Sequence, residues 1–166
     1  AATFPISGAV SGSGDVSGTT LADGTLVLSG ISGSPITGAT IVVNSDAVLQ
    51  AQSWVVDTDV ASSEISSGAA NDNILIQGGV TGSVIRTYGE QDELVIGNEA
   101  VDSTIRTNSE GDKLEVQGAV LGSDVASGKG DDSLIFGGGV ADSQIKLGLG
   151  ADVASFTGNV TNTQIS

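Results

Sequence analysis

The sequence contains no cysteine, no methionine and no histidine, and only two of its 166 residues are proline. Without cysteine, a disulfide framework and a thiolate metal site are both excluded, and redox chemistry gives no information about the compartment. Without histidine, the most common general base of enzymes is missing. Glycine accounts for 25 residues, yet the lack of proline excludes a collagen helix and a proline-rich linker.

Basic residues are also scarce, with 5 Lys and Arg against 20 Asp and Glu, so that the net charge is −15. This balance disfavours nucleic acid, whose phosphates require a basic surface, and it suits divalent cations. The sequence has no signal peptide and no apolar run of about 18 residues, so we expect no membrane insertion. A processed product and a fragment of a larger protein both remain open.

The apolar residues that are present, 39% of the chain, recur with a period of 20 residues. Six columns keep this period over more than 100 residues. They are Asp72, Asp92, Asp112, Asp132 and Asp152; Ser63, Ser83, Ser103, Ser123, Ser143 and Thr163; Ile65, Ile85, Ile105, Val125, Ile145 and Ile165; Val60, Val80, Ala100, Val120, Val140 and Val160; Trp54, Ile74, Leu94, Leu114, Leu134 and Ala154; and Val56, Ile76, Ile96, Val116, Phe136 and Phe156. A fixed period of this kind is the signature of a repeat architecture.

Each repeat consists of short β-type segments joined by glycine-rich bends. Triplets such as residues 74–76 place two apolar side chains on one face of a strand. Twenty residues are too few for a βαβ unit. We therefore predict an all-β fold, a parallel β-solenoid of the β-roll or β-helix type with 20-residue coils, in which the apolar columns line the interior.

The period is less regular before residue 60, so the chain divides into irregular N-terminal coils at 1–59 and a regular solenoid at 60–166, within one continuous domain. Leu26-Val27-Leu28 reproduces the apolar triplet of the later coils. Placing Ile36 in the column of Ile65 leaves 29 residues between them, which predicts about nine extra residues in a single expanded coil.

The turns before the Asp column carry the clearest motif. They include Gly128-Lys129-Gly130-Asp131-Asp132 and Gly148-Leu149-Gly150-Ala151-Asp152. This pattern resembles the calcium-binding RTX repeat, G-G-x-G-x-D-x-U-x with U apolar, and in particular its one-sided variety, found in the repeat region of a bacterial ice-binding adhesin. The resemblance covers roughly residues 68–156.

The resemblance implies right-handed coiling and calcium held between stacked turns by carboxylates and backbone carbonyls. Carried over by position, the ligand candidates are Asp72, Asp92, Asp112, Asp132 and Asp152, with Asp131 as a further carboxylate. Independently of the resemblance, carboxylates stacked about 4.8 Å apart need a compensating charge. Calcium suits them because it takes six to eight oxygen ligands in flexible geometry.

One alternative needs no metal: each Asp caps its turn by accepting backbone N–H bonds, as in Asx turns. The sequence also departs from the RTX pattern, since Tyr88, Glu90, Asn108 and Glu110 occupy positions where the pattern has glycine. Glycine there normally adopts backbone angles that Tyr and Glu disfavour and that Asn tolerates better.

The remaining columns suggest structure rather than catalysis. The serine column is interpreted as an inward ladder of hydroxyls, because no histidine is present to activate a nucleophile. Arg86, Arg106 and Lys146 form a basic stripe, which we expect to offset the acidic surface. Glu93 and Lys113 are expected to form a surface ion pair. No cluster of unlike residues interrupts the coils from 68 to 166, so we expect no enzymatic activity.

The function predicted from these features is that of a non-enzymatic, extracellular structural module. The composition resembles that of large secreted bacterial repeat proteins, including surface-layer proteins and adhesins, and of phage fibre proteins. We expect a part of a surface layer, filament or adhesin stalk at the cell surface, or of a fibre at the virion surface. Self-assembly or a continuation of the chain would cover the coil that ends at Ile165. The alternative is a module that binds surface glycans.

Overall fold

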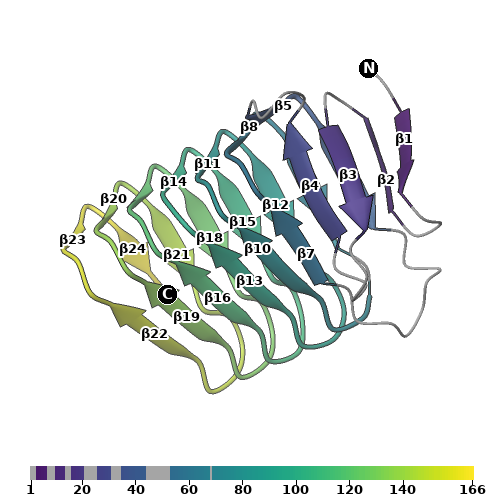
Figure 1. Cartoon of the computed structure of the whole chain (residues 1–166). Coiled ribbons are helices and arrows are strands. Elements are labelled where there is room, and N and C mark those ends of the chain that lie inside the picture. The colour runs from purple at the N-terminus through teal and green to yellow at the C-terminus, as the bar shows by residue number, and fades with distance from the viewer. Residues whose placement is uncertain are drawn as a thin grey trace.

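The computed structural model describes residues 3–6, 10–13, 16–20, 26–30, 35–43, 53–67 and 69–166. These residues form a β-solenoid in which every coil contributes one strand to each of three sheets. The coils stack along one axis, from β1–β3 at one end to β22–β24 at the other (Figure 1). The predicted all-β parallel solenoid is therefore confirmed. No helix in the described ranges is long and apolar enough to cross a membrane.

The eight-stranded sheet contains the apolar triplets. Its strands are β3 (Val16–Thr20), β4 (Leu26–Gly30), β7 (Ser53–Val56), β10 (Asn73–Ile76), β13 (Glu93–Ile96), β16 (Lys113–Val116), β19 (Ser133–Phe136) and β22 (Val153–Phe156). From β4 to β22 all neighbours are parallel, and from β7 onward each residue pairs with the residue 20 positions later.

A seven-stranded sheet follows each glycine-rich bend, and its strands are only two residues long. They are β5 (Ile36–Thr37), β8 (Val60–Ala61), β11 (Val80–Thr81), β14 (Ala100–Val101), β17 (Val120–Leu121), β20 (Val140–Ala141) and β23 (Val160–Thr161). All are parallel, since one strand direction is repeated in each coil.

The nine-stranded sheet completes each coil. Its strands are β1 (Thr3–Ile6), β2 (Val10–Ser13), β6 (Thr40–Val43), β9 (Glu64–Ser66), β12 (Val84–Arg86), β15 (Thr104–Arg106), β18 (Asp124–Ala126), β21 (Gln144–Lys146) and β24 (Gln164–Ile165). From β6 to β24 the pairing is parallel.

The core lies between the three sheets and consists of the predicted apolar columns. Within one coil, Ile74, Ile76, Val80 and Ile85 are fully buried, and the same positions are buried in the neighbouring coils. Because each coil repeats the same shape, it buries its apolar faces only against the coils before and after it. Phe136 and Phe156 stack with their ring centroids 5.0 Å apart.

The N-terminal strands differ from the predicted irregular coils. Strand β3 pairs antiparallel with β4, and β2 pairs antiparallel with both β1 and β6, so the chain direction reverses at this end of the sheets. The predicted position of Ile36 is wrong: Ile36 pairs with Val60, and Ile41 occupies the column of Ile65. The expansion is thus 24 residues from Ile36 to Val60, not 29 to Ile65.

One corner of every coil uses a left-handed backbone conformation that the sequence alone did not reveal. Between the seven-stranded and nine-stranded sheets, one residue per coil has a positive φ: Gly38, Ser62, Gly82, Asp102, Gly122, Asp142 and Asn162. The column mixes glycine with short polar residues, which are the residue types that best tolerate this conformation.

Replacing Gly128 with alanine should destabilise the fold far more than the same change at Gly82. Both residues have a positive φ, which alone costs alanine roughly 1–2 kcal/mol. A methyl group at Gly128 would lie 2.0 Å from the carbonyl oxygen of Asn108, whereas at Gly82 its nearest neighbour would be Ser62 Oγ at 3.9 Å. We expect Gly128→Ala to lose about 3 kcal/mol or more in chemical denaturation. Equal losses for the two variants would contradict the close stacking of the turns.

Candidate functional site

The Asp column lies inside the solenoid, under the glycine-rich turns that precede the strands of the eight-stranded sheet. Asp72, Asp92, Asp112 and Asp132 are only 2–4% exposed, and Asp152, in the last coil, is half-buried. Each Asp reaches back to the previous coil, where its Oδ1 accepts the backbone N–H of the preceding Asp at 2.8–3.0 Å. The caps predicted as an alternative to metal binding therefore exist, but they link neighbouring coils rather than closing one turn.

The second oxygen of these carboxyl groups is not satisfied. In Asp92, Asp112 and Asp132, Oδ2 is buried and has no hydrogen-bond partner. Burial raises the pKa of Asp92 to about 6 and that of Asp112 to about 7. The backbone amide of the preceding Asp and a threonine hydroxyl only partly offset the effect of burial. A buried carboxylate without a partner is costly, so each of these groups needs either a proton or a cation.

The turns that cover the column fall into two conformations. In three turns, two residues have a positive φ: Asn108 and Glu110, Gly128 and Gly130, and Gly148 and Gly150. These turns also pair with one another through the bridges Ser109–Lys129 and Lys129–Leu149. In the turn of Tyr88 and Glu90, it is Gly89 that has the positive φ. The RTX-like backbone is thus shared by the three C-terminal turns, even where Asn and Glu replace glycine.

The donor set fits calcium in its chemistry. Calcium prefers hard oxygen ligands and accepts backbone carbonyls as well as carboxylates. The described residues contain no group of three or more acidic, His or Cys side chains that could hold a metal, so carbonyls would have to complete each site. The stacked turns supply them, since the carbonyl oxygen of Gly128 lies 1.8 Å from the position that a methyl group at Gly148 would take.

The other acidic residues of the turns lie outside this row. Glu90, Glu110 and Asp131 are exposed, and Asp131 Oδ1 accepts the N–H of Ala151 at 2.8 Å. Asp131, which the sequence analysis added as a ligand candidate, therefore bridges two turns at the surface, and the structure does not bring it together with the buried column.

Two hydroxyl columns accompany the Asp column inside the solenoid. In the predicted serine column, Ser83 N–H donates to Ser103 Oγ, and Ser103 Oγ donates to the carbonyl of Val101. The ladder runs between coils as expected, with backbone amides as the donors. The second column, which sequence reasoning missed, contains Thr87, Thr107 and Ser127; their hydroxyls donate to carbonyls of the next coil. Its mixture of residue types made the column hard to recognise.

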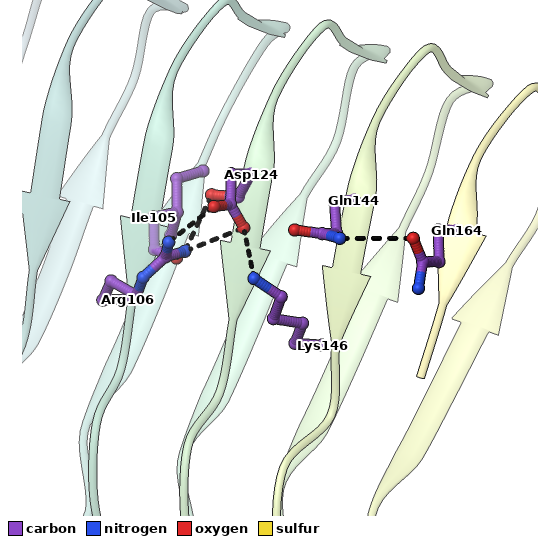
Figure 2. A network of polar contacts seen from close by, with 6 residues as sticks. All are labelled: Ile105, Arg106, Asp124, Gln144, Lys146 and Gln164. Carbon is purple, nitrogen blue, oxygen red and sulfur yellow. Dashed lines mark hydrogen bonds and ion pairs between the residues drawn. The ribbon is translucent and has the colours of Figure 1, made fainter.

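The basic stripe on the nine-stranded sheet is neutralised by neighbouring acids. Arg86 pairs with Glu64, and Arg106 contacts both carboxylate oxygens of Asp124. Figure 2 shows that Lys146 approaches the same carboxylate from the other side, at 3.9 Å. The predicted ion pair of Lys113 with Glu93 is also present. The stripe therefore offers an anionic ligand little free positive charge.

Without divalent cations, the protein should be more stable at pH 5 than at pH 8. The folded-state pKa values of Asp92 and Asp112 are raised above the ordinary 3.8, so the folded chain binds more protons than the unfolded chain between these values. The resulting stabilisation is complete below about pH 4 and is lost as the pH rises through 6 and 7. Thermal melts in EDTA should show a midpoint at least about 5 °C higher at pH 5.

The variant Asp112→Asn keeps an oxygen that accepts the Asp92 amide and cannot ionise. We expect it to raise the midpoint at pH 8 and to flatten the pH dependence. An unchanged pH dependence in this variant would show that other groups are responsible.

No family model, no curated protein and no solved structure matches the chain. The parallel solenoid with coils of about 20 residues is compatible with a β-roll. The relationship to RTX repeats stays a prediction that depends on the turn residues alone.

Proposed function

We propose that this chain is a structural repeat module, a rigid rod that forms part of an extracellular surface layer, filament, adhesin stalk or virion fibre. The observation that carries the proposal is the unbroken 20-residue register of all three sheets from β7 to β24. Every coil is joined to the next by backbone hydrogen bonds in each sheet and by the buried columns. Such a body resists bending and extends by the addition of further coils.

The same register supports association along the rod axis. In the coil of residues 148–166, Val153 is 62% exposed, and Val160 and Ile165 are 40% and 44% exposed. These residues belong to columns or strands that are covered by the next coil elsewhere in the rod. A further coil, from a longer chain or from a second copy, would cover them in the register that the structure already uses.

Calcium would rigidify the rod at the stacked turns. Asp112, Asp132 and Asp152, together with turn carbonyls, would hold it, with Asp72 and Asp92 continuing the row. When bound, calcium supplies the positive charge that stacked carboxylates require and links adjacent coils through shared ligands.

The absence of enzymatic activity is part of the same proposal. It is supported by the lack of histidine and cysteine in the sequence and by the use of the serine and aspartate columns in bonds between coils. These groups act on the backbone of the rod and not on a substrate.

Calcium should raise the thermal midpoint of the protein at pH 8. A ligand that binds only the folded state stabilises it by about 2.7 kcal/mol per site at a concentration one hundred times its Kd. We expect melts followed by circular dichroism to shift upward with calcium relative to EDTA, and much less with magnesium, which requires stricter octahedral geometry. The double variant Asp132→Asn, Asp152→Asn should lose the shift. Equal midpoints with calcium and EDTA in the unsubstituted chain would remove calcium from the proposal.

Electron microscopy of the purified chain should show rods that associate end to end as the concentration rises. The substitution Val153→Lys, at an exposed position of the last coil, should disperse them by charge repulsion. Leu121→Lys is the matched control, because Leu121 is 38% exposed on the side of the rod. Rods that stay dispersed at all concentrations, or that respond equally to both substitutions, would contradict axial self-assembly.

A further inference from the structure

The bend between the eight-stranded and seven-stranded sheets changes its residues in one part of the rod. In most regular coils this bend contains only small residues, as in Gly78-Gly79, Gly118-Ala119 and Gly138-Gly139. Two coils have polar side chains there instead, namely Thr58-Asp59 and Asn98-Glu99. Because the coils stack in register, Gly78-Gly79 forms a gap between these two polar walls.

The gap is a surface cavity of about 310 Å³. It is lined by Pro35, Asp59, Val60, Ala61, Gly79, Thr81, Asn98 and Glu99. Pro35, Val60 and Ala61 provide an apolar side, while Asp59, Thr81, Asn98 and Glu99 provide oxygen and nitrogen atoms. All four polar residues are exposed to solvent and therefore accessible to a ligand.

The floor of the cavity is held rigidly by the backbone. Val60 N–H donates to the carbonyl of Gly79, and Val80 N–H donates to that of Glu99, both at 2.9 Å. Asp59 Oδ1 accepts the N–H of Gly79 at 2.8 Å, which fixes this carboxylate at the rim. A methyl group at Gly79 would lie 3.0 Å from the carbonyl oxygen and 3.5 Å from Cγ of Glu99. Only glycine therefore keeps the space open, and a preformed site of this kind loses little entropy on binding.

The lining selects the chemistry of the ligand. Asp59 and Glu99 stand two coils apart, about 10 Å along the rod, which is too far for both to coordinate one metal ion at 2.3–2.6 Å. Two acidic groups and the net charge of −15 repel anions. Carboxylate, amide and hydroxyl groups beside an apolar wall suit a ring that carries several hydroxyls and has an apolar C–H face. The volume lies at the lower end for ligand sites, which run from about 300 to 1,000 Å³.

We propose that this cavity binds a ring of a neutral saccharide, either a free sugar or a residue of a glycan. Asp59 and Glu99 accept hydrogen bonds from sugar hydroxyls, Asn98 donates and accepts, and Pro35 packs against the ring. This proposal does not depend on self-assembly or on calcium, since the bend lies between other sheet edges than the Asp turns.

The test is a titration of the ¹⁵N-labelled protein with neutral sugars, followed by NMR. The probes are glucose, galactose, mannose and N-acetylglucosamine, and then neutral di- and trisaccharides built from them. We expect chemical-shift changes at the amides of Gly79, Asn98 and Glu99, with Kd values of about 1 mM. Saturation by a monosaccharide identifies a site for free sugars, whereas binding that requires the oligosaccharides identifies a site for glycans.

Matched variants localise the effect. Glu99→Gln and Asn98→Ala change exposed side chains and should each weaken binding about tenfold. Asn159→Ala is the control, because Asn159 is an exposed residue of the same bend column outside the cavity. No shift at these amides with any probe would overturn the proposal, as would equal weakening by the control. Shifts at Gly79 and Glu99 that follow calcium instead of sugar would also overturn it.

Discussion

The structure depends on a single constraint: each coil must stack directly on a copy of its own shape. Parallel pairing in three sheets places every residue against the residue 20 positions away, so each side chain meets another of its own column. Aliphatic columns gain from this arrangement, because like shapes pack at constant spacing. Hydroxyl columns gain as well, since a hydroxyl accepts an amide from one coil while it donates to a carbonyl. Columns of one charge are the only ones that the arrangement penalises.

The chain meets this penalty differently in each charged column. On the nine-stranded sheet, acids and bases in adjacent columns offset one another, as Glu64 does for Arg86. At the left-handed corner, glycine separates the acids, and Asp102 leans over Gly122, where a methyl group would lie 2.4 Å from its Oδ1. The inner Asp column has neither remedy, because its members are adjacent, buried and of one type. It is therefore the part of the rod whose stability must depend on protons or cations from solution.

Much of this architecture could be predicted from the sequence, because period and side-chain type suffice to identify a column of identical residues. The six predicted columns are the interior of the regular coils, and Leu26 and Leu28 do align with Trp54 and Val56. The position of Ile36 was mispredicted because two apolar columns lie only five residues apart, so an insertion of unknown length makes them interchangeable. The hydroxyl column of Thr87 and the corner column of Ser62 were missed for a different reason. Their members share a hydrogen-bonding ability or a backbone angle, and neither property is visible as a repeated letter.

In a repeat protein, a residue that obeys the period is explained by stacking, so information about ligands has to come from departures. The Asp column is regular, and its caps between coils account for half of its oxygen atoms without any ligand. The bend at Asn98 and Glu99 is irregular, and no bond between coils requires polar side chains there, because Gly118-Ala119 and Gly138-Gly139 make the same turn without them. A cavity exists at this bend because glycine in one coil lies between side chains in two others. Stacking alone gives no reason for that alternation, and an external partner with hydroxyl groups does.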